Sequence, residues 1–276
     1  MLDSLQHICL MHGMEVDYYK KLFQTIGNIL DLIEKDDMPK YLLFLESAFP
    51  YMDNYNYHKG MKEIIQELKV LLKTKSIGTD SDRALLLDFQ AALETQPEKA
   101  IKLEKDALAQ IENITADNAR LVSNLHANLG GLYRMNGYPD LAREHMEKSI
   151  SLLDQFNLLH INDSIPQIAN YAMFLTEQQE PERGISELQK LSGIIKEYHS
   201  DDCLDYAKVQ ETLGTIYLMT ANLPQAKTHF KRAFKIYEKI WADEPEMIEA
   251  KYQEIQELYP QIGFCIGKNL SGLLTK

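Results

Sequence analysis

The stretch that decides the fold is Leu213-Gly214-Thr215-Ile216-Tyr217, which is followed by Ala226, Phe230 and Ala233. Small and aromatic residues follow one another here at intervals of three, nine, four and three residues. Residues three or four apart share one face of an α-helix. The pattern therefore predicts two helices that cross closely where the small residues lie, with the aromatic rings filling the space around the crossing.

The same pattern recurs along the chain at a fixed interval. Eighty-four residues earlier, which is twice 42, Leu129-Gly130, Tyr133, Ala142, Met146 and Ser149 occupy the same places. The midpoint between these two sets repeats the pattern with Ala172, Leu175, Gly184, Leu188 and Leu191. One further step back gives Ala91, Ala100 and Ala107, while Asp88 and Glu104 depart from the pattern. A fixed period of this length is the signature of a helical repeat array.

Prolines follow the same period. Pro97, Pro139 and Pro181 are 42 residues apart, and Pro224 is displaced by one residue. Proline is favoured in the first turn of a helix, where its missing N–H has no partner to lose. Each proline is therefore predicted to open the second helix of a pair.

Composition and charge exclude several classes of protein. Apolar residues make up 45% of the 276 residues, which is too many for a disordered chain. The net charge of −12 without a cluster of cations argues against nucleic-acid binding and against a basic membrane-surface helix. Cys9, Cys203 and Cys265 are too few and too scattered for a disulfide framework. With no secretory signal and no apolar run of 18 residues, we expect a cytoplasmic protein.

The spacing of Gly214, Tyr217, Ala226, Phe230 and Ala233 resembles the tetratricopeptide repeat signature. The 42-residue period is similar to that of kinesin-light-chain repeats and of bacterial peptide-sensing regulators, and the resemblance covers Ser81 to Trp241. It implies an all-α, right-handed α-solenoid of about six antiparallel helix pairs plus a C-terminal capping helix. The expected domains are degenerate helical repeats at 1–78, four repeats at 79–242 and capping helices at 243–276.

The resemblance also implies a peptide-binding groove. In this family the first helix of each pair lines the concave face of the superhelix, and certain positions of that helix point into the groove. Carried onto this sequence, the predicted groove residues are Asn124, Asn128, Arg134, Asn170, Met173, Thr176, Lys208, Glu211 and Thr215.

Three kinds of side chain in this set can serve a peptide ligand. Asn128 and Asn170 are one period apart, and their amides can hold the backbone of an extended peptide, although plain surface polarity also explains them. Arg134 and Lys208 can receive a partner's carboxylate, or they are ordinary exposed charges. Met173 fits an adaptable apolar floor, or it fills the core.

Catalytic and metal-binding motifs are missing from the sequence. It contains no phosphate-binding loop, no HExxH and no GxSxG. His7, Cys9 and His12 lie close in sequence, but only Cys9 and His12 share a face of a helix. We therefore expect no enzyme, no cofactor and no metal.

Two functions remain open at this stage. The first is a scaffold or adaptor that holds an extended protein or peptide segment in its concave groove. The alternative is a peptide-responsive bacterial regulator whose superhelix changes pitch when it binds its ligand. The expected partner is a protein or peptide, not nucleic acid or a membrane, and self-association into a homo-oligomer stays possible.

Overall fold

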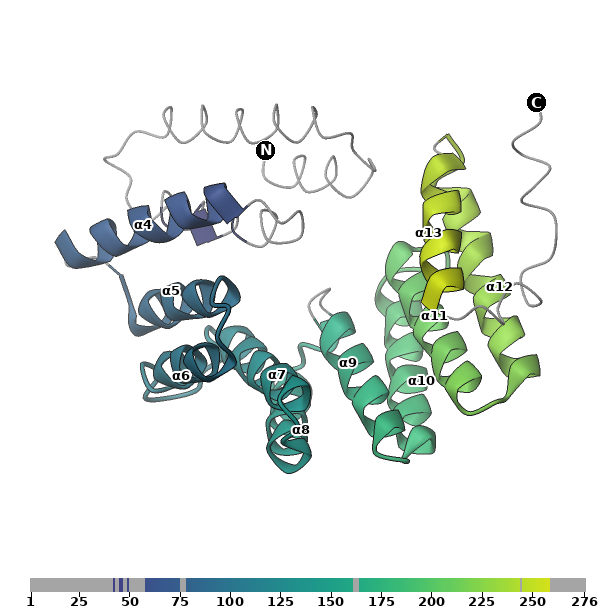
Figure 1. The fold of residues 1–276 in the computed structure, drawn as a ribbon, viewed down its shortest axis with the longest axis horizontal. Helices are drawn as coiled ribbons and strands as arrows, with labels where there is room; N and C mark the ends of the chain where they lie inside the picture. The colour runs from purple at the N-terminus through teal and green to yellow at the C-terminus, as the bar shows by residue number, and fades with distance from the viewer. Residues whose placement is uncertain are drawn as a thin grey trace. The chain divides into compact units, whose positions relative to one another are not determined.

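The computed structural model describes Leu42, Leu45, Glu46, Phe49 and residues 58–74, 78–160, 164–243 and 245–258. All regular elements within these residues are α-helices, which confirms the predicted fold class. In chain order they are α4 His58–Thr74, α5 Asp80–Ala92, α6 Pro97–Leu108, α7 Ala119–Met135, α8 Pro139–Gln155, α9 Ser164–Glu177, α10 Pro181–Tyr198, α11 Leu204–Met219, α12 Leu223–Ile240 and α13 Pro245–Leu258 (Figure 1).

The described residues divide into two compact units, one that ends at Phe156 and one that begins at Asn157. We call the described residues of the former, which contain α4 to α8, unit N, and those of the latter, which contain α9 to α13, unit C. The border falls between the second and third of the four repeats predicted at 79–242. The domain limits expected from the sequence describe its repeat pattern and stay a prediction.

Within each unit the helices pack as successive antiparallel pairs. In unit N, α5 packs on α6 and α7 packs on α8, while α7 also contacts α5 and α6 (Figure 1). In unit C, α9 packs on α10 and α11 packs on α12, while α11 also contacts α9 and α10. Each pair therefore stacks on the preceding pair of its own unit, as expected for a helical repeat.

The prolines open the second helices, as predicted. Pro97, Pro139 and Pro181 are the first residues of α6, α8 and α10, and Pro224 is the second residue of α12. The prolines therefore mark the start of the second helix in each repeat.

A left-handed residue ends the first helix in three of the pairs. Gly137, Gln179 and Ala221 have φ angles of 76°, 65° and 58°. The next residue in each case donates its N–H across the turn, for example from Glu180 to the Leu175 carbonyl at 2.8 Å. This is the Schellman arrangement, which satisfies carbonyls at a helix end and normally uses glycine. Of the three turns, only the first has a glycine at this position, Gly137.

Small residues at the crossings allow close approach of the two helices. A Cβ atom added to Gly184 would lie 2.6 Å from the Ala172 carbonyl oxygen, and one added to Gly214 would lie 2.9 Å from the Phe230 ring. At Gly130 it would lie 2.6 Å from Cγ of Met146. The prediction that these positions need small residues is confirmed.

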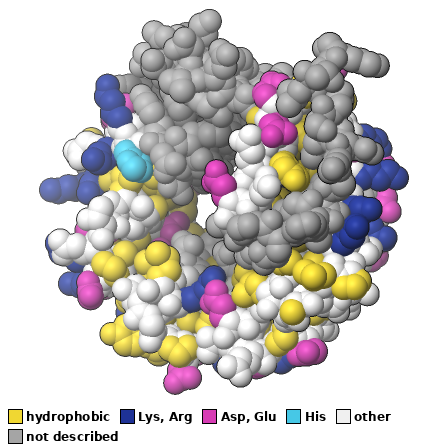
Figure 2. Space-filling model, turned by 45° about the vertical axis from the view of Figure 1, so that its right-hand side comes forward, with side chains coloured by type: hydrophobic (Ala, Val, Ile, Leu, Met, Phe, Trp, Pro, Cys, Tyr) yellow, Lys and Arg dark blue, Asp and Glu magenta, His cyan; other side chains and the backbone are white. Residues whose placement is uncertain are grey.

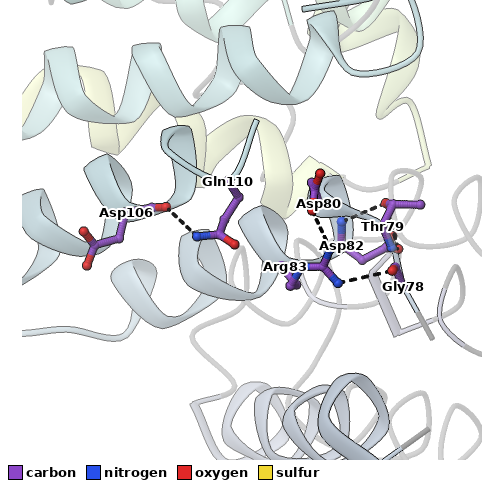
Figure 3. A network of polar contacts seen from close by, with 7 residues as sticks. All are labelled: Gly78, Thr79, Asp80, Asp82, Arg83, Asp106 and Gln110. Atoms are coloured by element: carbon purple, nitrogen blue, oxygen red, sulfur yellow. Dashed lines mark hydrogen bonds and ion pairs between the residues drawn. The ribbon is translucent and has the colours of Figure 1, made fainter. Parts of the chain in front are cut away.

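The start of α5 is fixed by a reciprocal cap (Figure 3). The Asp82 N–H donates to Thr79 Oγ1 at 3.2 Å, and the Thr79 N–H donates to the Asp82 carboxylate. Arg83 adds a hydrogen bond to the Gly78 carbonyl at 3.3 Å and an ion pair with Asp80. This capping box satisfies backbone donors that the first turn of a helix leaves unpaired.

The described residues on either side of the four predicted repeats are helical as well. Helix α4 lies in the segment expected to hold degenerate helical repeats, 1–78, and α13, which begins at Pro245, lies in the expected capping segment, 243–276. Residues 1–41 and 259–276 of these two segments lie outside the described residues.

Candidate functional site

The nine predicted groove residues lie on the first helices of three pairs. Asn124, Asn128 and Arg134 are on α7 of unit N, whereas Asn170, Met173 and Thr176 on α9 and Lys208, Glu211 and Thr215 on α11 belong to unit C. Most neighbours within a helix are three or four residues apart, so they share a face. Because α9 and α11 pack against each other, six of the nine belong to one pair of adjoining helices.

In unit N the Asn128 side chain is exposed and already engaged. Its amide nitrogen donates to the Asp88 carboxylate on α5 at 2.8 Å. Asn124 and Arg134 are half-buried, and both make contacts within the chain. The amide oxygen of Asn128 has no hydrogen-bond partner among the described residues, so it is the part of this side chain that is not engaged.

In unit C the predicted residues differ in exposure and in the contacts that they already make. Asn170 and Lys208 are exposed, and the Lys208 ammonium lies 3.9 Å from Asp205, a loose ion pair that leaves it accessible. The Thr176 hydroxyl donates to the Ala172 carbonyl of its own helix at 2.9 Å. Met173 and Thr215 are half-buried.

Glu211 connects three helices of unit C. Its carboxylate accepts a hydrogen bond from the Tyr237 hydroxyl of α12 at 2.6 Å and an ion pair from Lys251 of α13 at 2.9 Å. Burial and the Glu211 charge raise the pKa of Tyr237, which keeps this hydroxyl a donor. Burial alone would lower the pKa of Lys251, but Glu211 and Glu254 raise it. A ligand would therefore meet Glu211 as an already neutralised group.

A pair of acidic residues behind Asn128 was not predicted as part of the site. Glu104 on α6 is 2% exposed, and its side chain hydrogen-bonds with Asp88 and Asn128. Burial and the Asp88 charge raise the pKa of Glu104 far above its usual range. One of its oxygens, Oε2, is buried without a hydrogen-bond partner among the described residues. The sequence pattern that could have indicated this pair is the presence of Asp88 and Glu104 at the positions that Gly130 and Met146 occupy one period later.

A second acidic pair lies in the same unit. Burial and the neighbouring Asp82 raise the pKa of Glu46 to about 8. Glu46 precedes Asp88 by 42 residues and therefore occupies the same repeat position.

A histidine pair between α7 and α8 is a further polar feature that sequence reasoning missed. Nδ1 of His126 lies 2.9 Å from Nδ1 of His145, beside an open hollow of about 440 Å³ that is also lined by Glu144 and Lys148. His145 stacks on Tyr133 with 5.4 Å between ring centroids. Eighty-four residues later, His229 stacks on Tyr217 and bonds Gln210. This recurrence of a polar pair beside a tyrosine, two periods apart, is the sequence pattern that could have indicated the histidine pair.

Surface charge does not single out one ligand. On the face shown in Figure 2, acidic and basic side chains are interspersed with hydrophobic ones. Within the described residues no three metal-ligating side chains cluster, and no helix is long and apolar enough to cross a bilayer.

These helix pairs, with their small-residue crossings and 42-residue period, define an all-α helical repeat protein. Residues 164–239, which contain α9 to α12, match the model of the tetratricopeptide repeat family. The matched segment thus consists of tetratricopeptide repeats, and it covers the helix pairs α9–α10 and α11–α12 of unit C.

Solved structures share this fold at low sequence identity. BtubC (BKLC) from P. vanneervenii is 16% identical with a TM-score of 0.53, over 75% of this chain and 88% of that one. A putative kinesin light chain from Podosopora anserina with nearly identical repeats is 14% identical with a TM-score of 0.54, over 73% and 97%. The apo form of RapI is 14% identical with a TM-score of 0.55, over 98% and 77%. No curated protein matches the sequence.

Proposed function

We propose that the chain is a cytoplasmic, non-enzymatic scaffold that holds an extended protein or peptide segment against the first helices of its repeats. The observation that carries this proposal is the division of polar residues over those helices. On α9 and α11 the residues that face the partner helix of each pair are buried, among them Ala172, Leu175 and Gly214, while Asn170 and Lys208 remain exposed. An exposed polar stripe on a rigid helical surface is suited to peptide recognition.

The exposed stripe offers three kinds of recognition. Asn170 supplies an amide that can pair with a peptide backbone, and Asn128 supplies its amide oxygen separately, on α7 of unit N. Lys208 supplies a cation that is only loosely paired with Asp205. Met173 and Met219 add polarizable apolar surface that adapts to different side chains.

Screening an immobilised library of random nine-residue peptides tests the proposal. Wild-type protein should retain a subset of the library, and the double variant Asn128→Ala/Asn170→Ala should bind that subset roughly tenfold more weakly, which corresponds to about 1.4 kcal/mol. The matched control is Asn113→Ala/Gln189→Ala, which removes two exposed amides elsewhere. Equal binding by both double variants would contradict the role of the two amides in peptide binding. If the wild-type protein retained no peptide, the proposed function would be wrong.

The regulator predicted as the alternative is kept for one reason, the likeness in fold to apo RapI over 98% of this chain. The two functions differ in their response to a free ligand. A regulator should change its radius of gyration in small-angle scattering when a retained peptide is added at saturation. A scaffold should bind the same peptide with its scattering curve unchanged.

A further inference from the structure

Helix α7 of unit N contains two adjacent glycines, and packing explains only the first of them. A Cβ atom on Gly130 would lie 2.6 Å from Cγ of Met146, so the crossing with α8 requires a glycine there. A Cβ atom on Gly131 would meet no other side chain of the described residues within 4 Å. Glycine is less favourable in a helix interior than any residue except proline. The fold of the described residues therefore does not require Gly131.

Other helix pairs carry a side chain at the position of Gly131. One period earlier this position holds Phe89, which is 3% exposed and stacks on Phe49. One and two periods later it holds Met173 and Thr215, which are half-buried. Glycine is the residue that lets another group approach the backbone closely. Gly131 therefore leaves a recess in α7 where these other helices are filled.

The recess lies in the middle of the exposed face of α7. Asn128 precedes Gly131 by three residues and Met135 follows it by four, so all three lie on one side of the helix. The Asn128 amide nitrogen is bonded to Asp88 of α5 at 2.8 Å, and Met135 is 85% exposed. Burial of a methionine is favourable, and its flexible thioether adapts to partners of different shape. The recess thus has a bare backbone floor and one adaptable apolar wall.

We infer that Gly131 and Met135 form a subsite on α7 for a large apolar side chain of the bound peptide. The inference rests on the proposed function and names one feature of its ligand. A side chain seated over Gly131 would touch the helix directly and cover Met135, which removes apolar surface from water on both partners. A charged group would lose water there and gain no partner from either residue, so the subsite selects for apolar side chains.

The test uses pools of immobilised random nine-residue peptides whose central residue is fixed as leucine, phenylalanine or alanine. Wild-type protein should retain the leucine or the phenylalanine pool several-fold more than the alanine pool. Gly131→Gln, which places a polar side chain in the recess, should bring that ratio close to one. Its melting temperature should equal or exceed that of the wild type, because glutamine favours the helix and the space is open.

Two further variants separate the subsite from a general effect of replacing a helical glycine. Gly193→Gln on α10 is the matched control, because a Cβ atom there also meets nothing within 4 Å among the described residues. It gains the same helix propensity and should keep the wild-type ratio. Met135→Ala removes the apolar wall without filling the recess, and it should lower the ratio.

Several results would overturn the subsite and leave the proposed function standing. They are a ratio near one in the wild type, a wild-type ratio in both Gly131→Gln and Met135→Ala, and an equal loss of the ratio in Gly193→Gln. A lower melting temperature for Gly131→Gln would show that this position packs within the fold, which also overturns the subsite. Retention of none of the pools by the wild type overturns both the subsite and the proposed function.

Discussion

At the scale of single residues, the turns between paired helices carry strain that can be removed. Ala221 has a φ of 58°, the region in which an L side chain is disfavoured and glycine is not. Gly137 occupies the equivalent place 84 residues earlier. We predict that Ala221→Gly raises the free energy of unfolding by about 0.5–1 kcal/mol, measured by urea denaturation.

The matched control for this prediction is another alanine at a helix end. Ala109 caps α6 with a φ of −68°, which alanine adopts without strain. Ala109→Gly should therefore lower stability, because glycine only adds freedom to the unfolded chain. A loss of stability in both variants would show that the turn at Ala221 is not strained.

The histidine pair makes unit N sensitive to acid. Burial, then the neighbouring His145 and Lys148, lower the pKa of His126 to about 4, and burial also lowers that of His145 despite Glu144. Both imidazoles are therefore neutral in the folded chain at pH values where the unfolded chain begins to bind protons. The contribution of this pair to stability is complete above pH 6.5 and falls as the pH drops toward 4.

Replacing His126 with glutamine should reduce this acid sensitivity. Gln210 pairs with His229 at the equivalent place, so glutamine can keep the hydrogen bond without titrating. Between pH 7 and pH 5, His126→Gln should lose about 1 kcal/mol less stability than the wild type, after allowance for solvent screening of a half-buried group. His58→Gln, on an exposed residue of α4, should follow the wild-type curve; if it matches His126→Gln instead, the pair is not the source.

At the scale of the elements, α10 contains both a required and a dispensable glycine. A Cβ atom on Gly184 would press on the Ala172 carbonyl at 2.6 Å, whereas one on Gly193 would meet nothing within 4 Å. We predict that Gly184→Ala lowers the free energy of unfolding by about 1–3 kcal/mol, because the added methyl group overpacks the crossing. Gly193→Ala should raise it by up to about 1 kcal/mol through helix propensity, and equal effects would contradict the close crossing.

The helices were predictable because their signals are local and repeated. Pro139 and Pro181 fix the starts of α8 and α10, and the spacing of Gly214 from Phe230 fixes the crossing of α11 with α12. The turns were harder to predict, because Gln179 and Ala221 adopt the left-handed conformation that usually indicates glycine. Here the closure of the helix pair overrides local preference.

The contacts of the candidate site could be predicted from the sequence only in part. The family resemblance predicts Asn128 and Asn170 as groove residues, and both side chains are exposed, but their role in a groove stays a prediction. The resemblance gave no sign that the Asn128 amide would be held by Asp88, or Glu211 by Tyr237 and Lys251. Those partners come from other helices, and pairings between helices depend on side-chain geometry that a single sequence does not specify.

At the scale of the whole molecule, two compact units predict unfolding in more than one step. Trp241 is the only tryptophan of the chain, and it stacks on Tyr237 in unit C at 4.8 Å between ring centroids. Its fluorescence therefore reports unit C, whereas circular dichroism reports all helices. We predict that Gly130→Leu, which overpacks Met146 in unit N, shifts the dichroism transition to lower urea and leaves the fluorescence transition in place. Movement of both transitions together would show that the two units unfold as one.

The buried acid of α6 ties folding of the chain to the buffer around it. Because burial and Asp88 raise the pKa of Glu104 well above neutrality, this group keeps its proton in the native chain and sheds it on unfolding at pH 7.5. Calorimetric unfolding heats should therefore be less endothermic in Tris than in phosphate, since Tris releases far more heat on taking up a proton. Glu104→Gln should narrow that gap by about one proton's worth of buffer ionisation enthalpy.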